Sequence, residues 1–212
     1  MSKNIIISLF DYTGVWSQPY RDNGYEVIQI DIQLGDDIMT WDYTEIDKSR
    51  VYGILAAVPC TDYAVSGARW FKEKDKDGRT EESQKIVAKT KEIIDYFEPE
   101  MWVIENPISR IHNLNPWMEK PKFYFHPHEF SGYGFDDERY TKKTALYGKF
   151  NAPEKKNLKP YTTGDNGKMQ YPKDENGKHL GWGTIEAKNF RSKTPKGFSI
   201  AFYNANNGGV FH

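Results

Sequence analysis

The first half of the chain consists of short apolar runs separated by polar and charged segments. Runs rich in β-branched and aliphatic residues predict four buried strands: 4–10, 25–30, 52–58 and 101–104. Ahead of the last run, apolar residues at helical spacing predict a long amphipathic helix: Ile86, Val87, Ile93, Ile94 and Phe97. Strands that alternate with helices predict an α/β fold, with a mostly parallel, doubly wound sheet and helices on both faces.

Local signals place the ends of two predicted helices. Ser17, with Pro19 in the first turn and Gly24 as a stop, predicts a short helix between the first two strands. Thr80 is predicted to cap the long helix, and the charged stretch 72–79 before it is predicted to be a mobile surface loop.

The second half of the chain has weaker periodicity. Residues 116–149 are rich in aromatic side chains and predict a β-rich edge of the sheet. The segment 151–190 is rich in Gly, Lys, Asn and Asp and predicts loops with room for a hairpin. Residues 194–206 then predict a turn and an amphipathic helix.

Composition and charge narrow the class of protein. The 212 residues, 38% hydrophobic and 15% aromatic, fit a single domain spanning 1–212, and we expect a monomer. No apolar run reaches the roughly 18 residues of a membrane span, and the N-terminus does not resemble a signal peptide. We therefore expect a cytoplasmic protein that does not contact membranes. With a formal net charge of −1, any binding of phosphate groups must come from local patches.

The sequence contains a single cysteine, Cys60, which follows Pro59 just after the third apolar run. One cysteine forms no internal disulfide and gives no metal cluster. Chemistry in an open α/β sheet gathers beyond the carboxyl ends of the strands, so Cys60 is a candidate nucleophile. The alternative is an inert, buried thiol. The fourth run leads into Glu105 in the same way, and this pairing favours a catalytic site over a structural salt bridge at Glu105.

A thiol and a carboxyl group at neighbouring strand ends suit conjugate addition to a pyrimidine. The thiolate attacks carbon-6 of cytosine, and a carboxyl group that protonates or hydrogen-bonds N3 eases the attack. Carbon-5 then becomes nucleophilic and accepts a methyl group, so that covalent catalysis splits one difficult step into two. Glu105 must hold a proton near neutral pH, which predicts that burial raises its pKa.

The turn after the first strand predicts a cofactor site. A strand that leads through a glycine-containing turn to a helix N-terminus lets a ligand approach the backbone closely. Asp31, at the end of the second strand, can accept hydrogen bonds from ribose hydroxyls, with a solvated carboxylate as the alternative. Asp37 can accept one from an adenine amino group. The layout suits a dinucleotide or S-adenosylmethionine, and the lack of a full G-x-G-x-x-G fingerprint counts against the dinucleotide.

Taken in order, these motifs resemble those of the cytosine-5 DNA methyltransferases, especially the small members carried by bacteriophages. The resemblance covers nearly the whole chain and implies a Rossmann-like, S-adenosylmethionine-dependent methyltransferase fold. It rests on 9–17 for the first cofactor motif, Asp31 and 35–38 for the next two, Pro59-Cys60 for the nucleophile, 66–70 for the catalytic loop, Glu105-Asn106-Pro107 for the Glu-Asn motif, 140–148 for the strand that supports the target base and 191–198 for the last motif.

The resemblance also implies roles for individual residues. Catalysis would depend on Cys60, Glu105, Asn106 and Pro59, with Asn106 orienting the loop that carries the nucleophile. S-adenosylmethionine would contact Phe10, Asp11, Thr13, Gly14, Trp16, Asp31, Ile32, Asp37, Ile38 and Thr194. Duplex DNA with a flipped cytosine would contact Ser66, Arg69, Trp70, Lys142, Lys143 and Thr144. For Arg69 and Trp70, a simple loop anchor is the alternative. No metal is implied.

The chain departs from this family at several points. Tyr12 stands where the family usually has glycine, which restricts backbone approach to the methionine part of the cofactor. Asp62 lies close to the nucleophile, and its field would disfavour the thiolate. Lys142 and Lys143 replace the usual arginines and would hold phosphate as point charges. Only the segment 151–190 is available for target recognition, so any readout of sequence must be short.

The predicted function is therefore methyl transfer from S-adenosylmethionine to carbon-5 of cytosine in DNA, through a covalent cysteine adduct. Two alternatives stay open. The same chemistry on single-stranded DNA, RNA or a free pyrimidine nucleotide is favoured by the short recognition segment and the net charge near zero. A catalytically silent relative that binds DNA or a partner follows if Tyr12 and Asp62 have disabled the site.

Overall fold

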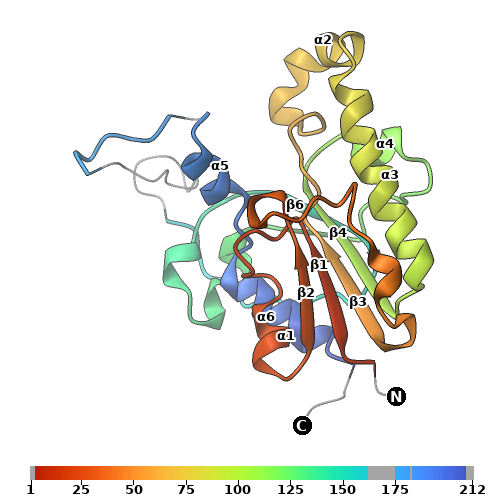
Figure 1. Ribbon diagram of the computed structural model, residues 1–212. Helices are drawn as coiled ribbons and strands as arrows, with labels where there is room; N and C mark the ends of the chain where they lie inside the picture. The colour runs from red at the N-terminus through yellow and green to blue at the C-terminus, as the bar shows by residue number, and fades with distance from the viewer. Residues whose placement is uncertain (1–2, 162–174, 182, 209–212) are drawn as a thin grey trace.

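The computed structural model describes residues 3–161, 175–181 and 183–208 (Figure 1). Its strands are β1 (Ile5–Leu9), β2 (Glu26–Ile30), β3 (Val51–Ala56), β4 (Met101–Pro107), β5 (Phe123–Phe125) and β6 (Thr144–Lys149). Its α-helices are α1 (Gln18–Asp22), α2 (Phe71–Lys76), α3 (Arg79–Phe97), α4 (Ile111–Leu114), α5 (Ile185–Ser192) and α6 (Lys196–Ala205). None of the helices in these ranges combines the length and apolar character that a membrane span needs.

The strands form one six-stranded sheet in the order β2-β1-β3-β4-β6-β5. β1 pairs in parallel with β2 and β3, and β3 pairs in parallel with β4. β6 is antiparallel to both β4 and β5. The predicted α/β class with a mostly parallel sheet is therefore confirmed.

The order of the strands creates a crevice at one edge of the sheet. From β1 the chain moves outward to β2 and then returns to the other side of β1 to form β3. Connections that leave in opposite directions from neighbouring strands open a crevice at the carboxyl ends of those strands. Because β6 is antiparallel, its first residue lies at the edge where the parallel strands end.

Helices cover both faces of the sheet, as the alternation of residues along β1 requires. Ile5 and Ile7 pack in one apolar cluster with Val87 of α3. Ile6 points to the other face and joins a second cluster that includes Phe198 of α6. In Figure 1, α3 lies on one side of the sheet and α1 and α6 lie on the other.

The starts of two helices differ from the prediction. Ser17 precedes α1, but its side chain makes no capping bond to the helix and instead donates to the Asp11 carboxylate at 3.0 Å. The long helix α3 begins at Arg79, after Gly78 in the left-handed conformation, and Thr80 donates to Asp75 at 2.7 Å instead of capping. Both hydroxyls donate to a nearby carboxylate and accept no bond from the first N–H groups of their helix.

The charged stretch predicted to be a loop is largely helical, because α2 occupies Phe71–Lys76. The predicted β-rich edge contains β5 and β6, joined through short 3-10 helices. Of the segment 151–190, residues 162–174 and 182 lie outside the described residues, and 151–161 form neither helix nor strand. The prediction of loops is wrong at its end, where Thr184 caps α5 by accepting a hydrogen bond from the Ala187 N–H at 3.2 Å.

Candidate active site

A cavity of about 940 Å³ opens at the carboxyl-terminal edge of the sheet. Its walls come from the segments that follow β1, β2 and β3, from the end of β4, from the residues before β6 and from α5. It therefore occupies the crevice that the strand order creates, which is the usual place for ligands in an open α/β sheet.

Most of the predicted site residues line this one cavity. From the predicted cofactor set these are Phe10, Asp11, Thr13, Asp31, Ile32, Asp37, Ile38 and Thr194. From the predicted catalytic and substrate sets they are Pro59, Cys60, Glu105, Ser66 and Lys142. The fold thus brings together side chains that are distributed from the first strand to the start of the last helix.

Two predicted cofactor contacts are corrected by the structure. The indole of Trp16 is fully buried and packs against Phe198 and Phe202, with ring centroids 6.0 and 5.8 Å away. It fills the apolar layer between the sheet and α6, away from the cavity wall. Gly14 is also absent from the wall, and its φ of +66° shows that the turn needs glycine for its conformation.

Four predicted substrate contacts also lie outside the cavity wall. Thr144 is buried at the start of β6, and the ammonium group of Lys143 lies over the ring of Tyr124, 5.3 Å from its centroid. Arg69 stacks over the exposed ring of Trp70 at 5.1 Å, within the 3-10 helix Val65–Trp70 that follows the nucleophile. Arg69 and Trp70 could therefore meet only a substrate that extends beyond the cavity.

Cys60 lies in a tight turn beyond the end of β3. The N–H groups of Tyr63 and Ala64 both donate to its carbonyl oxygen, at 3.0 and 2.9 Å. The half-buried thiol has a raised pKa, chiefly because burial disfavours the thiolate and also because Glu105 adds a negative charge nearby. Lys142 and Arg191 act in the opposite direction. The resting thiol is therefore mostly protonated at neutral pH.

Glu105 lies on β4 beside the nucleophile segment. Burial raises the pKa of its carboxyl group, as predicted, and the charge of Lys142 opposes this shift. The neighbouring Asn106 is fully buried, and its side-chain amide donates to the Val58 carbonyl oxygen at 2.9 Å. Strand β4 thus supplies both a carboxyl group with a raised pKa and a bond to the segment that leads to Cys60.

The turn after β1 forms the opposite wall of the cavity. Phe10 has a φ of +60°, an uncommon backbone conformation for a residue other than glycine. Its N–H donates to the Ile30 carbonyl at 2.8 Å, and the carboxylate of Asp11 accepts from the hydroxyls of Ser8 and Ser17 at 2.9 and 3.0 Å. These bonds hold a strained turn in place against the cavity.

Asp31 and Asp37 each use one carboxylate oxygen to cap a turn. Asp31 accepts from the Gln33 N–H and Asp37 accepts from the Met39 N–H, both at 2.9 Å. Among the described residues, no side chain or backbone N–H donates to the second carboxylate oxygen of either aspartate. That oxygen is therefore available to a ligand in the cavity. Tyr12 also lines the cavity and is 40% exposed.

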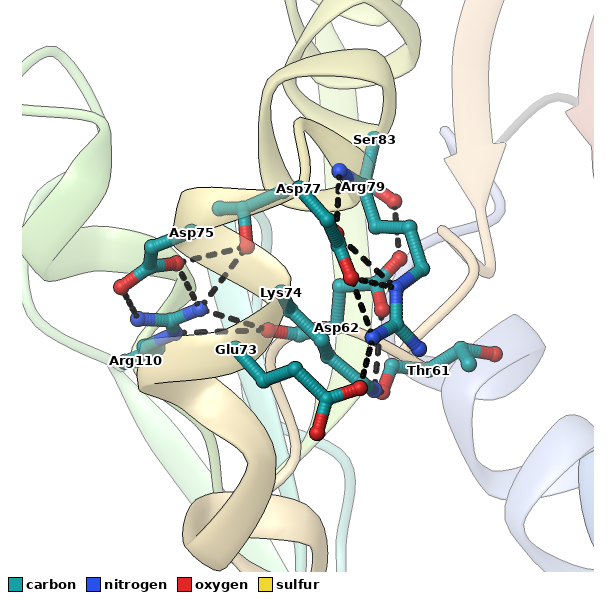
Figure 2. A network of polar contacts seen from close by, with 10 residues as sticks. Thr61, Asp62, Glu73, Lys74, Asp75, Asp77, Arg79, Ser83 and Arg110 are labelled. Carbon is teal, nitrogen blue, oxygen red and sulfur yellow. Dashed lines mark hydrogen bonds and ion pairs between the residues drawn. The ribbon is translucent and has the colours of Figure 1, made fainter.

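The predicted effect of Asp62 on the thiolate is corrected by its surroundings. Its carboxylate pairs with Lys74 at 2.9 Å and accepts a hydrogen bond from Ser83 (Figure 2). Burial favours a higher pKa for Asp62, but the bonds from Ser83 and Lys74 outweigh it and hold the pKa below its ordinary value. Glu105, and not Asp62, is the acidic residue whose charge raises the pKa of Cys60.

Helix α5, which forms part of the site, was not predicted as a helix. It contributes Ile185, Lys188 and Asn189 to the wall, and the side chains of Asn189 and Gln33 exchange hydrogen bonds at 3.0 and 3.2 Å. This bond pair connects α5 to the turn after β2. Thr184, a good capping residue directly before the helix, was the signal in the sequence that could have located it.

No protein-family model matches this chain, and no curated protein matches it. The function of the cavity is therefore inferred from the residues that line it. Within the described residues, no group of three or more His, Cys, Asp or Glu side chains is arranged to hold a metal ion.

Proposed function

We propose that the protein transfers a methyl group from S-adenosylmethionine to carbon-5 of cytosine in DNA, through a covalent adduct with Cys60. One observation carries the proposal: a thiol and a carboxyl group with a raised pKa share a cavity with the acidic residues at the ends of β1 and β2. The proposal includes the finer fold assignment, a Rossmann-like methyltransferase of the cytosine-5 family, which the ordered motifs support.

The chemistry assigns a separate task to each catalytic residue. The Sγ atom of Cys60 bonds to carbon-6 of the cytosine, while the protonated carboxyl group of Glu105 donates to N3 and accommodates the electron pair that moves there. Carbon-5 then bonds to the methyl group of S-adenosylmethionine, which is left as S-adenosylhomocysteine. Loss of the carbon-5 proton to solvent then provides the electron pair that expels the Cys60 thiolate from carbon-6, and the N3 proton returns to Glu105. Asn106 holds the backbone before Cys60 through the Val58 carbonyl.

The opposite end of the cavity fits the cofactor. The available oxygen of Asp31 suits a ribose hydroxyl, and that of Asp37 suits an adenine amino group. The turn at Phe10 to Thr13 lies where the methionine part would approach β1, with Tyr12 as part of the wall. When bound, S-adenosylmethionine supplies an electrophilic methyl group.

A second candidate substrate is single-stranded DNA, RNA or a free pyrimidine nucleotide. It is favoured by the charges that line the cavity near Cys60, where Lys142 and Arg191 act on the thiol. Two cations near the reacting base suit one or two phosphate groups without an extended duplex surface.

The proposal is tested by trapping. A duplex that contains 5-fluorocytosine is incubated with S-adenosylmethionine and the protein, and the mixture is resolved under denaturing conditions. Because fluorine blocks the final elimination, we expect a denaturant-resistant adduct that forms with the wild-type protein and is absent from Cys60→Ser.

The substrate form decides between the alternatives. An adduct with single-stranded DNA, RNA or the nucleotide, but none with the duplex, would select the second candidate. If the duplex, single-stranded DNA, RNA and the nucleotide all give no adduct, and the cytosine-containing controls stay unmethylated, the proposed methyl transfer is wrong. A catalytically silent binding protein is then the alternative that is left.

A further inference from the structure

The backbone directly after the nucleophile is held by two cationic side chains from other elements, the buried Lys74 and the partly buried Arg110. Lys74 comes from α2, and Arg110 follows β4 (Figure 2). Each donates to a carbonyl oxygen in the two residues that follow Cys60, Thr61 and Asp62. Neither cation lines the cavity.

Lys74 makes a double contact with this segment. Its ammonium donates to the Thr61 carbonyl at 2.6 Å and pairs with the Asp62 carboxylate at 2.9 Å. Only 9% of the lysine side chain is exposed. Lysine is rarely buried without a partner, and here both partners belong to the segment beside the nucleophile.

Arg110 contacts the same segment from the other side. Its Nε and Nη2 atoms donate to the Asp62 carbonyl, both at 3.3 Å. The guanidinium group also binds the carboxylate of Asp75 at 2.7 and 2.9 Å and lies over the ring of Phe71 at 3.8 Å. Arg110 therefore joins helix α2 to the segment and fixes the distance between them.

Three other carbonyls of this segment, those of Val58, Cys60 and Tyr63, have uncharged donors. Val58 is bound by Asn106, Cys60 by the N–H groups of the following turn, and Tyr63 by the Arg110 N–H at 3.0 Å. The carbonyls of Thr61 and Asp62 go to charged side chains instead. Hydrogen bonds to charged groups are about twice as strong as neutral ones, so the short bond from Lys74 to Thr61, directly after the nucleophile, is the strongest of these.

We propose that Lys74 and Arg110 are positioning residues, which hold the backbone after Cys60 so that the thiol faces the substrate beside Glu105. The inference rests on the proposed function. The cations act through geometry, because the positive charges with the strongest effect on the thiol are Lys142 and Arg191. A misplacement of about 1 Å can cost about 100-fold in rate, so a loosened segment has a measurable effect.

The first measurement is the single-turnover rate of adduct formation with the 5-fluorocytosine duplex. Lys74→Met is compared with Lys76→Met, which makes the same change on an exposed residue of the same helix. We expect Lys74→Met to react at least about tenfold more slowly, with unchanged affinity for duplex and cofactor, and Lys76→Met to match the wild-type protein. Lys74→Arg keeps the charge and restores most of the rate.

The second measurement does not require catalysis. Cys60 is the single cysteine of the chain, so the alkylation rate with iodoacetamide reports on this thiol alone. The rate is followed against pH at a temperature well below the unfolding midpoint of each variant. We expect a higher alkaline plateau for Lys74→Met, because a released segment exposes the thiol, and no change for Lys76→Met.

The outcomes separate the two proposals. If the wild-type protein traps no substrate, methyl transfer is wrong, and the alkylation plateau alone decides whether Lys74 positions the thiol. If Lys74→Met keeps both the adduct rate and the plateau and merely unfolds at lower temperature, Lys74 only stabilises the fold and the inference is overturned. Should Lys74→Met not fold, the same two measurements use Arg110→Lys, which keeps the charge but loses the forked contact with Asp62.

Discussion

At the scale of single residues, burial and nearby charge set the ionisation of both Cys60 and Glu105. Burial disfavours the charged form of both and raises both pKa values, and the negative charge that Glu105 carries once it ionises further opposes the thiolate. The raised pKa of Glu105 favours the protonated carboxyl group that its proposed role requires, and the raised pKa of Cys60 favours the thiol, which then needs activation by the bound substrate. The burial that makes the Cys60 thiol slow to react therefore also favours the protonated form of Glu105.

The substitution Glu105→Gln tests two effects of Glu105 separately: its influence on the pKa of Cys60 and its role as the proton donor to N3. Removal of the carboxylate lowers the pKa of Cys60, so the midpoint of iodoacetamide alkylation moves to lower pH. Adduct formation falls about 100-fold, because the amide cannot deliver a proton to N3. As a matched control, Lys142→Met removes a charge that favours the thiolate and moves the midpoint to higher pH. Equal midpoints in all three proteins would contradict this account.

Some residue-level features followed from the sequence and others could not. The pairing of Cys60 with Glu105 was predictable, because each directly follows an apolar run and parallel strands end at a common edge. The neutralisation of Asp62 was not, because Lys74 and Ser83 reach it from two later helices. Trp16 was misplaced because an aromatic residue beside a motif has the same appearance in sequence whether it faces a ligand or the core.

At the scale of elements, α2 and α5 show why polar helices are difficult to predict from the sequence. Helix α2 lacks an apolar stripe, and its place is fixed by pairs to distant residues: Lys74 with Asp62 and Asp75 with Arg110. Helix α5 depends on its Thr184 cap and on the bonds from Asn189 to the turn after β2. Tertiary contacts, rather than hydrophobic periodicity, decide both elements, whereas α3 was predicted from its apolar face.

The contribution of α5 to cofactor binding is measured with Asn189→Ala. Loss of the two bonds to Gln33 releases α5 from the wall beside Asp31, and we expect the dissociation constant for S-adenosylmethionine to rise about five- to tenfold. Isothermal titration calorimetry measures the affinity, and Glu186→Gln, an exposed change on the same helix, serves as the control. Unchanged affinity in Asn189→Ala would remove α5 from the cofactor site.

At the scale of the whole molecule, the sheet places the ends of four parallel strands and the start of one antiparallel strand around a single cavity. The apolar runs predicted the four parallel strands. The strand order was not predictable in its second half, because β6 pairs with β4 across a long, aromatic-rich stretch with little periodicity. The cavity therefore had to be seen in the structure, although most residues on its wall were named beforehand.

The salt dependence of binding reports which nucleic acid the whole molecule accepts. The cavity wall carries four cations: Lys142, Lys188, Arg191 and Lys193. If about three of them neutralise phosphates of a duplex, the logarithm of the association constant falls with the logarithm of salt with a slope of about −3. Fluorescence anisotropy with a labelled duplex and a labelled single strand measures both slopes. A slope near zero for the duplex would point instead to a free nucleotide as the substrate.

The raised pKa of Cys60 also determines how the thiol reacts with oxidants. Thiolates, and not thiols, attack peroxides, so a protonated and half-buried thiol is converted slowly to a sulfenic acid. The chain has no second cysteine, so a sulfenic acid at this position would have no internal thiol with which to form a disulfide. Burial that makes the nucleophile slow at rest therefore also protects it from irreversible damage between reactions.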